Sequence, residues 1–112
     1  MNPIELIGHI PVFFCGAMGT MLQSRGLGAG LSSDAWTLTH PEEVYAAHKA
    51  YLDAGCDMIK TNTFSTNRLR RADYAEAVRA ACEIARRAVR DAGGGRAVCL
   101  DIGPTGRLLA PM

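Results

Sequence analysis

The sequence lacks long hydrophobic runs, a strong net charge and a basic N-terminal leader, and only 6% of its residues are aromatic. No apolar stretch approaches the ~20 residues of a membrane-spanning helix, and the first ten residues lack the regions of a secretory signal. The formal net charge of +1 gives the chain no strong electrostatic field. With 48% hydrophobic and 21% charged residues, the composition indicates a small globular domain. We expect a cytoplasmic protein with no membrane and no nucleic-acid partner.

Metal-site and disulfide patterns are also missing from the sequence. The four cysteines, at positions 15, 56, 82 and 99, include no Cys-x-x-Cys pair, and the three histidines show no metal-ligand spacing. This excludes a zinc finger and argues against a disulfide framework in a cytoplasmic chain. We expect most thiols to be buried, and the histidines to be structural or solvent-exposed.

Short apolar strands alternate with helices along the chain. Strands are predicted at residues 11–15, 56–64 (with an exit loop) and 97–102, because these runs end at glycine or at polar turns. Helices are predicted at residues 21–25, 39–54 and about 73–92. This strand-helix-strand-helix-strand order indicates an α/β fold with a parallel sheet and right-handed crossovers.

Both longer helices are predicted to begin with a capping box. Thr39 and Glu42 have the spacing of an N-cap residue and its N3 partner, and Pro41 would lie in the first turn. Asp73 and Glu76 have the same spacing before the second helix. Glycines at 55 and at 93–95 are predicted to end the two helices.

Ligands of parallel α/β sheets bind beyond the carboxyl ends of the strands, which selects residues 16–20, 61–67 and 103–107. Those segments read Gly-Ala-Met-Gly-Thr at 16–20, Thr-Asn-Thr-Phe at 61–64 and Ile-Gly-Pro-Thr-Gly at 102–106. Leu-Thr-His-Pro-Glu at 38–42 opens a helix between the first two. In this order the motifs resemble the homocysteine S-methyltransferase family, in particular the homocysteine-binding domain of cobalamin-dependent methionine synthase.

The resemblance implies a (β/α)₈ TIM barrel, of which residues 1–112 would be the N-terminal portion, since a complete barrel takes ~250 residues. It implies methyl transfer to the zinc-bound thiolate of homocysteine, giving methionine. Zinc ligands in the family are cysteines of later strands, so we expect no metal ligand in this chain and no activity from it alone. Cobalamin and methyltetrahydrofolate would act only through other domains.

Two candidate substrate-binding residues depart from the family pattern. Cys15 stands where the family usually has Asp, and Lys60 stands where it commonly has Glu. A thiol is a poor substitute for a carboxylate that faces an ammonium group, so homocysteine as the acceptor stays open at this point. The candidate substrate-binding residues are Cys15, Gly16, Ala17, Met18, Lys60, Asn62, Thr63 and Asp101, with no catalytic or metal-ligating residue among them.

Several of these side chains have two open interpretations. Lys60 and Asp101 lie on neighbouring predicted strands ~4.8 Å apart, so we hypothesise an interior ion pair; alternatively Lys60 extends to water at the barrel mouth. For Cys15 a neutral packed thiol is favoured over a nucleophile or metal ligand. Asn62 and Thr63 either contact substrate or satisfy local backbone groups.

Two other functional classes compete with the methyltransferase. One is a non-catalytic truncated barrel that self-associates, or pairs with a complementary chain, through exposed sheet edges and uncovered apolar faces. The other, weaker class is an anion-binding module that uses the glycines at the strand ends. The sequence ends at Met112 without a helix that closes the last element, and the truncated-barrel hypothesis rests on this feature.

Overall fold

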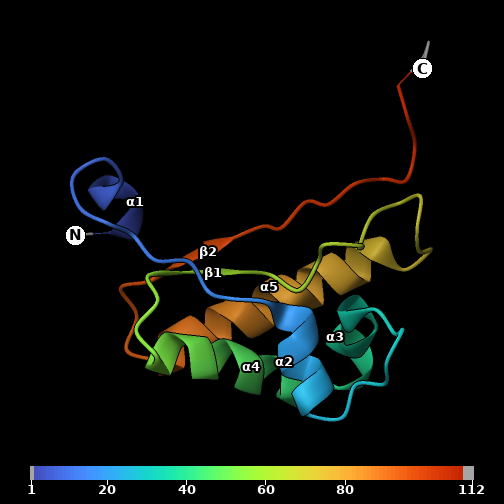
Figure 1. The fold of residues 1–112 in the computed structure, drawn as a ribbon, viewed down its shortest axis with the longest axis horizontal. Helices are drawn as coiled ribbons and strands as arrows, with labels where there is room; N and C mark the ends of the chain where they lie inside the picture. Colours follow the sequence, from blue (N-terminus) through green and yellow to red (C-terminus); the bar gives the residue numbers. More distant parts are fainter. Residues whose placement is uncertain (1, 110–112) are drawn as a thin grey trace.

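The structure, a computed structural model, describes residues 2–109, so most of the predicted open end at residues 109–112 lies outside it. Short helices precede an α/β unit, and the chain alternates between the two element types as predicted (Figure 1). None of the helices within residues 2–109 has the length and apolar character of a membrane span. The elements are α1 (Pro3–Leu6), α2 (Met18–Ser24), η1 (Ser33–Ala35), α3 (Trp36–Thr39), α4 (Pro41–Asp53), β1 (Met58–Lys60), α5 (Tyr74–Asp91) and β2 (Ala97–Cys99).

Strand β1 lies between two parallel neighbours. On one side it pairs with β2, where Lys60 is opposite Cys99. On the other side Phe14 forms a parallel bridge to Met58, and the amide of Cys15 donates to the Met58 carbonyl at 2.9 Å. Two of the three predicted strands therefore form a parallel pair, and the segment predicted as the first strand lies parallel beside them. The first, predicted at 11–15, is reduced to this bridge, and the last ends at Cys99 rather than at residue 102, because neither has a second partner within the described residues.

Helices α4 and α5 cover one face of the sheet (Figure 1). Ile59 of β1 is fully buried there and packs with Leu52, Ala85 and Ala88. Small alanines on α5 let this helix approach α4 and the sheet closely, and apolar burial of this kind contributes about 25 cal/mol per Å². The opposite face of the sheet carries side chains that stay accessible, including Phe14.

The helix starts differ from the predicted capping boxes. Thr39 belongs to α3, and its hydroxyl donates to the Ala35 carbonyl at 3.0 Å, so it does not cap α4. Helix α4 begins at Pro41, one residue later than the predicted N-cap at Thr39 implies, with His40 as the N-cap residue and without a side-chain cap. Asp73 is the N-cap residue of α5, but its carboxylate binds the Arg71 guanidinium instead of a helix amide. In both cases a partner two to four residues earlier in the chain binds the side chain that was expected to cap the helix.

The short helix after the first strand begins earlier than predicted. It was expected at residues 21–25, whereas α2 starts at Met18 and includes Gly19 and Thr20. Two helix ends agree with the prediction: Gly55 and Gly93 follow α4 and α5 with φ values of 102° and 97°, a left-handed conformation that glycine adopts without strain.

His48, predicted to be structural or exposed, is completely buried on the inner face of α4. Neither ring nitrogen has a hydrogen-bond partner within the described part of the chain. Burial without a partner disfavours the charged imidazolium and lowers the pKa of His48 from 6.5 to about 4. The residue therefore packs as a neutral ring.

This burial predicts a specific loss of stability in acid. Because the pKa of His48 is lower in the folded than in the unfolded chain, its contribution is complete above pH 6.5 and falls as the pH drops toward 4. Between pH 7 and pH 4.5, we expect about 2 kcal/mol of the lost unfolding free energy to come from this residue. Urea unfolding at both pH values should show that His48→Leu removes this part. His9→Leu, at an exposed position, should keep it; an equal pH dependence in all three proteins would contradict the assignment.

Candidate functional site

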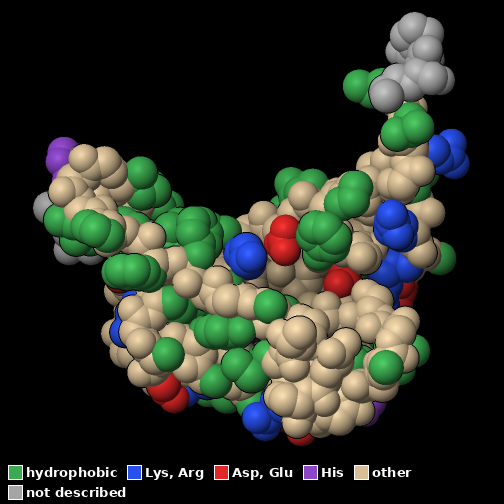
Figure 2. Space-filling model, in the orientation of Figure 1, with side chains coloured by type: hydrophobic (Ala, Val, Ile, Leu, Met, Phe, Trp, Pro, Cys, Tyr) green, Lys and Arg blue, Asp and Glu red, His purple; other side chains and the backbone are tan. Residues whose placement is uncertain are grey.

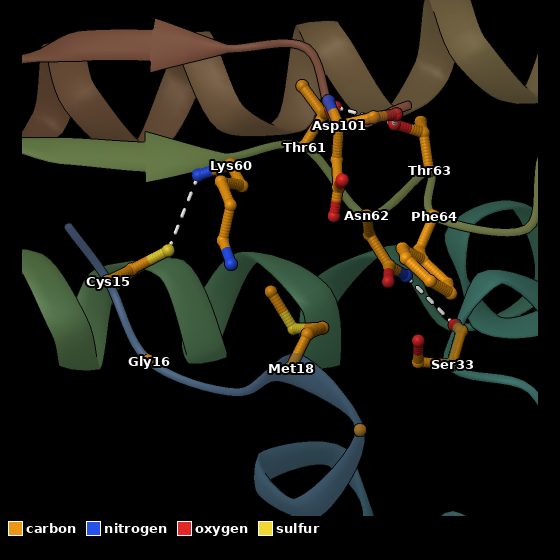
Figure 3. A pocket seen from close by; sticks show the side chains of 11 residues that line it. Cys15, Gly16, Met18, Ser33, Lys60, Thr61, Asn62, Thr63, Phe64 and Asp101 are labelled. Atoms are coloured by element: carbon orange, nitrogen blue, oxygen red, sulfur yellow. Dashed lines mark hydrogen bonds between the residues drawn. The ribbon is translucent and has the colours of Figure 1, made fainter. Parts of the chain in front are cut away.

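A cavity of about 220 Å³ opens where the three parallel segments end. Each segment contributes residues at or just beyond its last strand position, and the starts of α2 and η1 close the sides (Figure 3). Backbone and side-chain polar groups line it together with Met18 and Phe64. The lining residues are Cys15, Gly16, Met18, Gly19, Ser33, Lys60, Thr61, Asn62, Thr63, Phe64 and Asp101.

Lys60 and Asp101 supply the charge in this cavity. Both are half-buried, and their charged ends point into the cavity (Figure 3). The predicted ion pair between them is wrong: within residues 2–109 the pairs closer than 4.0 Å join other residues. The register explains this, because Lys60 is opposite Cys99, which lies two residues before Asp101. The two α-carbons are thus offset by ~6–7 Å along the sheet.

Asn62 and Thr63 use their polar groups to fix the loop after β1. The Asn62 amide nitrogen donates to the Ser33 carbonyl at 2.8 Å and to the Thr37 hydroxyl at 3.1 Å. The Thr63 hydroxyl donates to the Asp101 carbonyl at 2.7 Å. Both residues are buried. These bonds favour the interpretation that Asn62 and Thr63 position the cavity wall.

Asp34, which the sequence did not single out, is the buried anchor of the same loop. Its carboxylate accepts from the Ser65 amide at 2.8 Å and from the Thr66 hydroxyl at 2.5 Å. Asp34 is only 4% exposed, and its carboxylate also accepts a hydrogen bond from the Ser32 hydroxyl at 3.5 Å. The available signal was Ser32 two residues before Asp34, a spacing typical of a turn or helix start. Its long-range partners are not visible in the sequence.

The segment after the first strand approaches the cavity through its backbone. The Cys15 thiol accepts from the Lys60 amide at 3.3 Å and packs against the cluster around Leu52, as expected for a packed thiol. Gly16 lies against the Tyr51 ring, where a β-carbon would be 2.8 Å from the ring edge. Ala17 is the one predicted site residue outside the cavity lining, and its carbonyl accepts from the Tyr51 hydroxyl at 2.6 Å.

The described residues do not form a metal site. All four cysteines are free, and burial raises the pKa of the Cys56 and Cys99 thiols, which keeps them protonated near neutral pH. No three His, Cys, Asp or Glu side chains within residues 2–109 lie close enough together to hold a metal ion. In the cavity, one thiol and one carboxylate lie beside the Lys60 ammonium, and this set does not fit the four-ligand site of zinc.

Comparison with known proteins gives the family. Residues 12–112 match homocysteine S-methyltransferase. The chain belongs to the homocysteine S-methyltransferase family. Among solved structures it is similar to the homocysteine methyltransferase MmuM from Escherichia coli, with 24% identity and a TM-score of 0.77 for the metallated form. The values for the oxidized form are 22% and 0.74.

These matches cover most of this chain but less than half of the solved proteins. They include 94% of this chain and 42% of the metallated MmuM chain, and 95% and 42% for the oxidized form. At such identities the likeness shows the fold, namely part of a TIM-barrel-type fold. The match over residues 12–112 confirms the predicted resemblance to this family.

Gly103 determines how closely the third segment approaches the loop after β1. A β-carbon at this position would overlap the Phe64 carbonyl oxygen and lie 2.9 Å from the Phe64 ring. Because that obstacle is backbone, we expect Gly103→Ala to push the loop aside and to cost about 1–3 kcal/mol of unfolding free energy. Chemical denaturation measures this loss.

Gly19→Ala is the matched control for this substitution. A β-carbon on Gly19 meets nothing within 4 Å, and the residue lies in helix α2, where alanine is favoured over glycine. The control should leave stability unchanged or raise it by up to ~1 kcal/mol. Equal losses for Gly103→Ala and Gly19→Ala would contradict the close approach at Gly103.

Proposed function

We propose that this chain binds the amino-acid end of homocysteine in the strand-end cavity and so positions it as the acceptor of a methyl group, giving methionine. The observation that carries the proposal is that the motifs after the first two parallel segments line one cavity together with Asp101, which follows the third. The cavity combines a cation, an anion and the apolar Met18 and Phe64 side chains. Homocysteine has the matching groups, because it is a zwitterion with an apolar thiol-bearing side chain.

In this proposal the chain binds and orients the acceptor, and sulfur activation depends on groups outside it. A free thiol has a pKa near 8.5, so methyl transfer at neutral pH needs a group that stabilises the thiolate. Zinc supplies that chemistry in the family, yet the described residues do not fit it. We therefore expect the chain alone to be inactive. In this proposal the cavity residues bind the methyl acceptor and not the methyl donor, so cobalamin and methyltetrahydrofolate would act through other domains. The proposal also includes a cytoplasmic location.

Titration with L-homocysteine tests the proposal directly. In amide NMR spectra of the isotope-labelled chain, we expect ligand-induced shifts to cluster at Lys60, Thr61, Asn62 and Asp101. 1-Propanethiol is the matched control, because it has the thiol and the carbon chain but neither charge. It should produce no comparable shifts. Shifts confined to surfaces away from the cavity, or none at all with homocysteine, would overturn the proposal.

Exposed apolar side chains support a second candidate function, self-association as a non-catalytic barrel fragment. Phe13 and Phe14 are 64% and 55% exposed on one outer segment, and Leu100 and Ile102 are 52% and 81% exposed beyond the other. Hydrophobic side chains gather along the hollowed face in Figure 2. Apolar surface of this extent marks a contact surface, and β2 has no second strand partner within the described residues.

Sedimentation velocity over a range of protein concentrations tests this second candidate. We expect a concentration-dependent dimer, and we expect Phe14→Ser with Ile102→Ser to weaken dimerisation at least tenfold by removing apolar contact area. Ile4→Ser is the control, because Ile4 is 59% exposed but lies on α1. A monomer at every concentration would rule out this candidate without affecting the homocysteine proposal.

A further inference from the structure

We propose that Lys60 and Asp101 form a two-point clamp that selects α-amino acids, with the substrate carboxylate on Lys60 and the substrate ammonium on Asp101. This inference rests on the proposed function and specifies its substrate class and orientation. It assigns Lys60 as a specificity-determining residue. An interior ion pair with Asp101 would have left the Lys60 ammonium unavailable to a ligand.

The first argument is that these are the unsatisfied charges of the cavity. Within residues 2–109, neither the Lys60 ammonium nor the Asp101 carboxylate has an ion-pair partner within 4.0 Å, and neither has a side-chain hydrogen bond. Asp101 bonds through its backbone alone, to Thr61 and Thr63. Half-buried charges without partners are costly, and ligand groups of opposite charge would offset that cost.

The second argument is the separation of the two charges. The parallel register offsets Lys60 from Asp101 by ~6–7 Å along the sheet, so they do not close on each other. Both side chains nevertheless enter the same cavity (Figure 3). A ligand with adjacent carboxylate and ammonium groups fits between them, with one hydrogen bond of ~2.8 Å to each side.

The third argument is that the other side-chain donors of the wall already have hydrogen-bond partners. The Asn62 amide nitrogen and the Thr63 hydroxyl donate to backbone and side-chain acceptors of the loops. The Cys15 sulfur is a weak acceptor and already accepts a hydrogen bond from the Lys60 amide. The orientation of the amino acid therefore follows from Lys60 and Asp101, the two charged side chains that line the cavity.

The test compares two ligands on the full 112-residue chain and its variants by NMR titration. L-Homocysteine has both charges, whereas 3-mercaptopropylamine lacks the carboxylate. We expect Lys60→Met to weaken homocysteine binding at least tenfold and to leave 3-mercaptopropylamine binding unchanged, because only homocysteine has a carboxylate that would lose its charged hydrogen bond to Lys60. Asp101→Asn should weaken both ligands.

Lys49→Met is the matched control, because it removes the other lysine of the chain, which lies on α4 outside the cavity. It should change neither affinity. Lys60→Gln serves as a second variant if Lys60→Met fails to fold. If homocysteine binds in the cavity with equal affinity to the parent chain and to a folded Lys60 variant, the clamp is overturned and the proposed function stands. If homocysteine does not bind the parent chain, the proposed function fails and the clamp with it.

Discussion

Parallel pairing on both sides of β1 is the constraint on which the rest of the structure depends. The segment around Phe14 lies on one side of β1 and strand β2 on the other, and both are parallel to β1. All three segments therefore end at the same edge. The loops that follow are therefore neighbours, although they are separated by roughly 40 residues of sequence each. The packing of Ile59 against α4 and α5 fixes one face of this arrangement and leaves the other face to form a site.

Some polar groups at that edge fix the cavity wall through hydrogen bonds, and others have no partner among the residues that the structure describes and can bind a ligand. Asp34, Asn62 and Thr63 hold the loop after β1 through buried hydrogen bonds, and Gly103 lets the next loop approach it closely. A buried network of this kind is rigid because each lost partner leaves an unsatisfied group that costs about 1–3 kcal/mol. The charges of Lys60 and Asp101 remain available for a ligand in this preorganised wall.

The sequence was sufficient to predict the strand-helix order, the parallel sheet, the family and most of the residues that line the cavity. Local periodicity and glycine positions encode the order of strands and helices directly, whereas the family followed from the resemblance of the strand-end motifs. It was not sufficient for the caps at Thr39 and Asp73, where partners two to four residues earlier in the chain compete with the helix amides. The Lys60–Asp101 ion pair also failed, because register depends on three-dimensional pairing rather than on alternation alone. The burial of His48 and the partners of Asp34 likewise depend on packing between distant segments.

A crystal structure of the chain with L-homocysteine tests the central claim most directly, because it reports the position and orientation of the ligand together. The account predicts the α-carboxylate within ~3.2 Å of Lys60 Nζ and the ammonium within ~3.2 Å of an Asp101 carboxylate oxygen. A ligand in the reverse orientation would contradict it. So would a direct ion pair between Lys60 and Asp101 with homocysteine bound elsewhere.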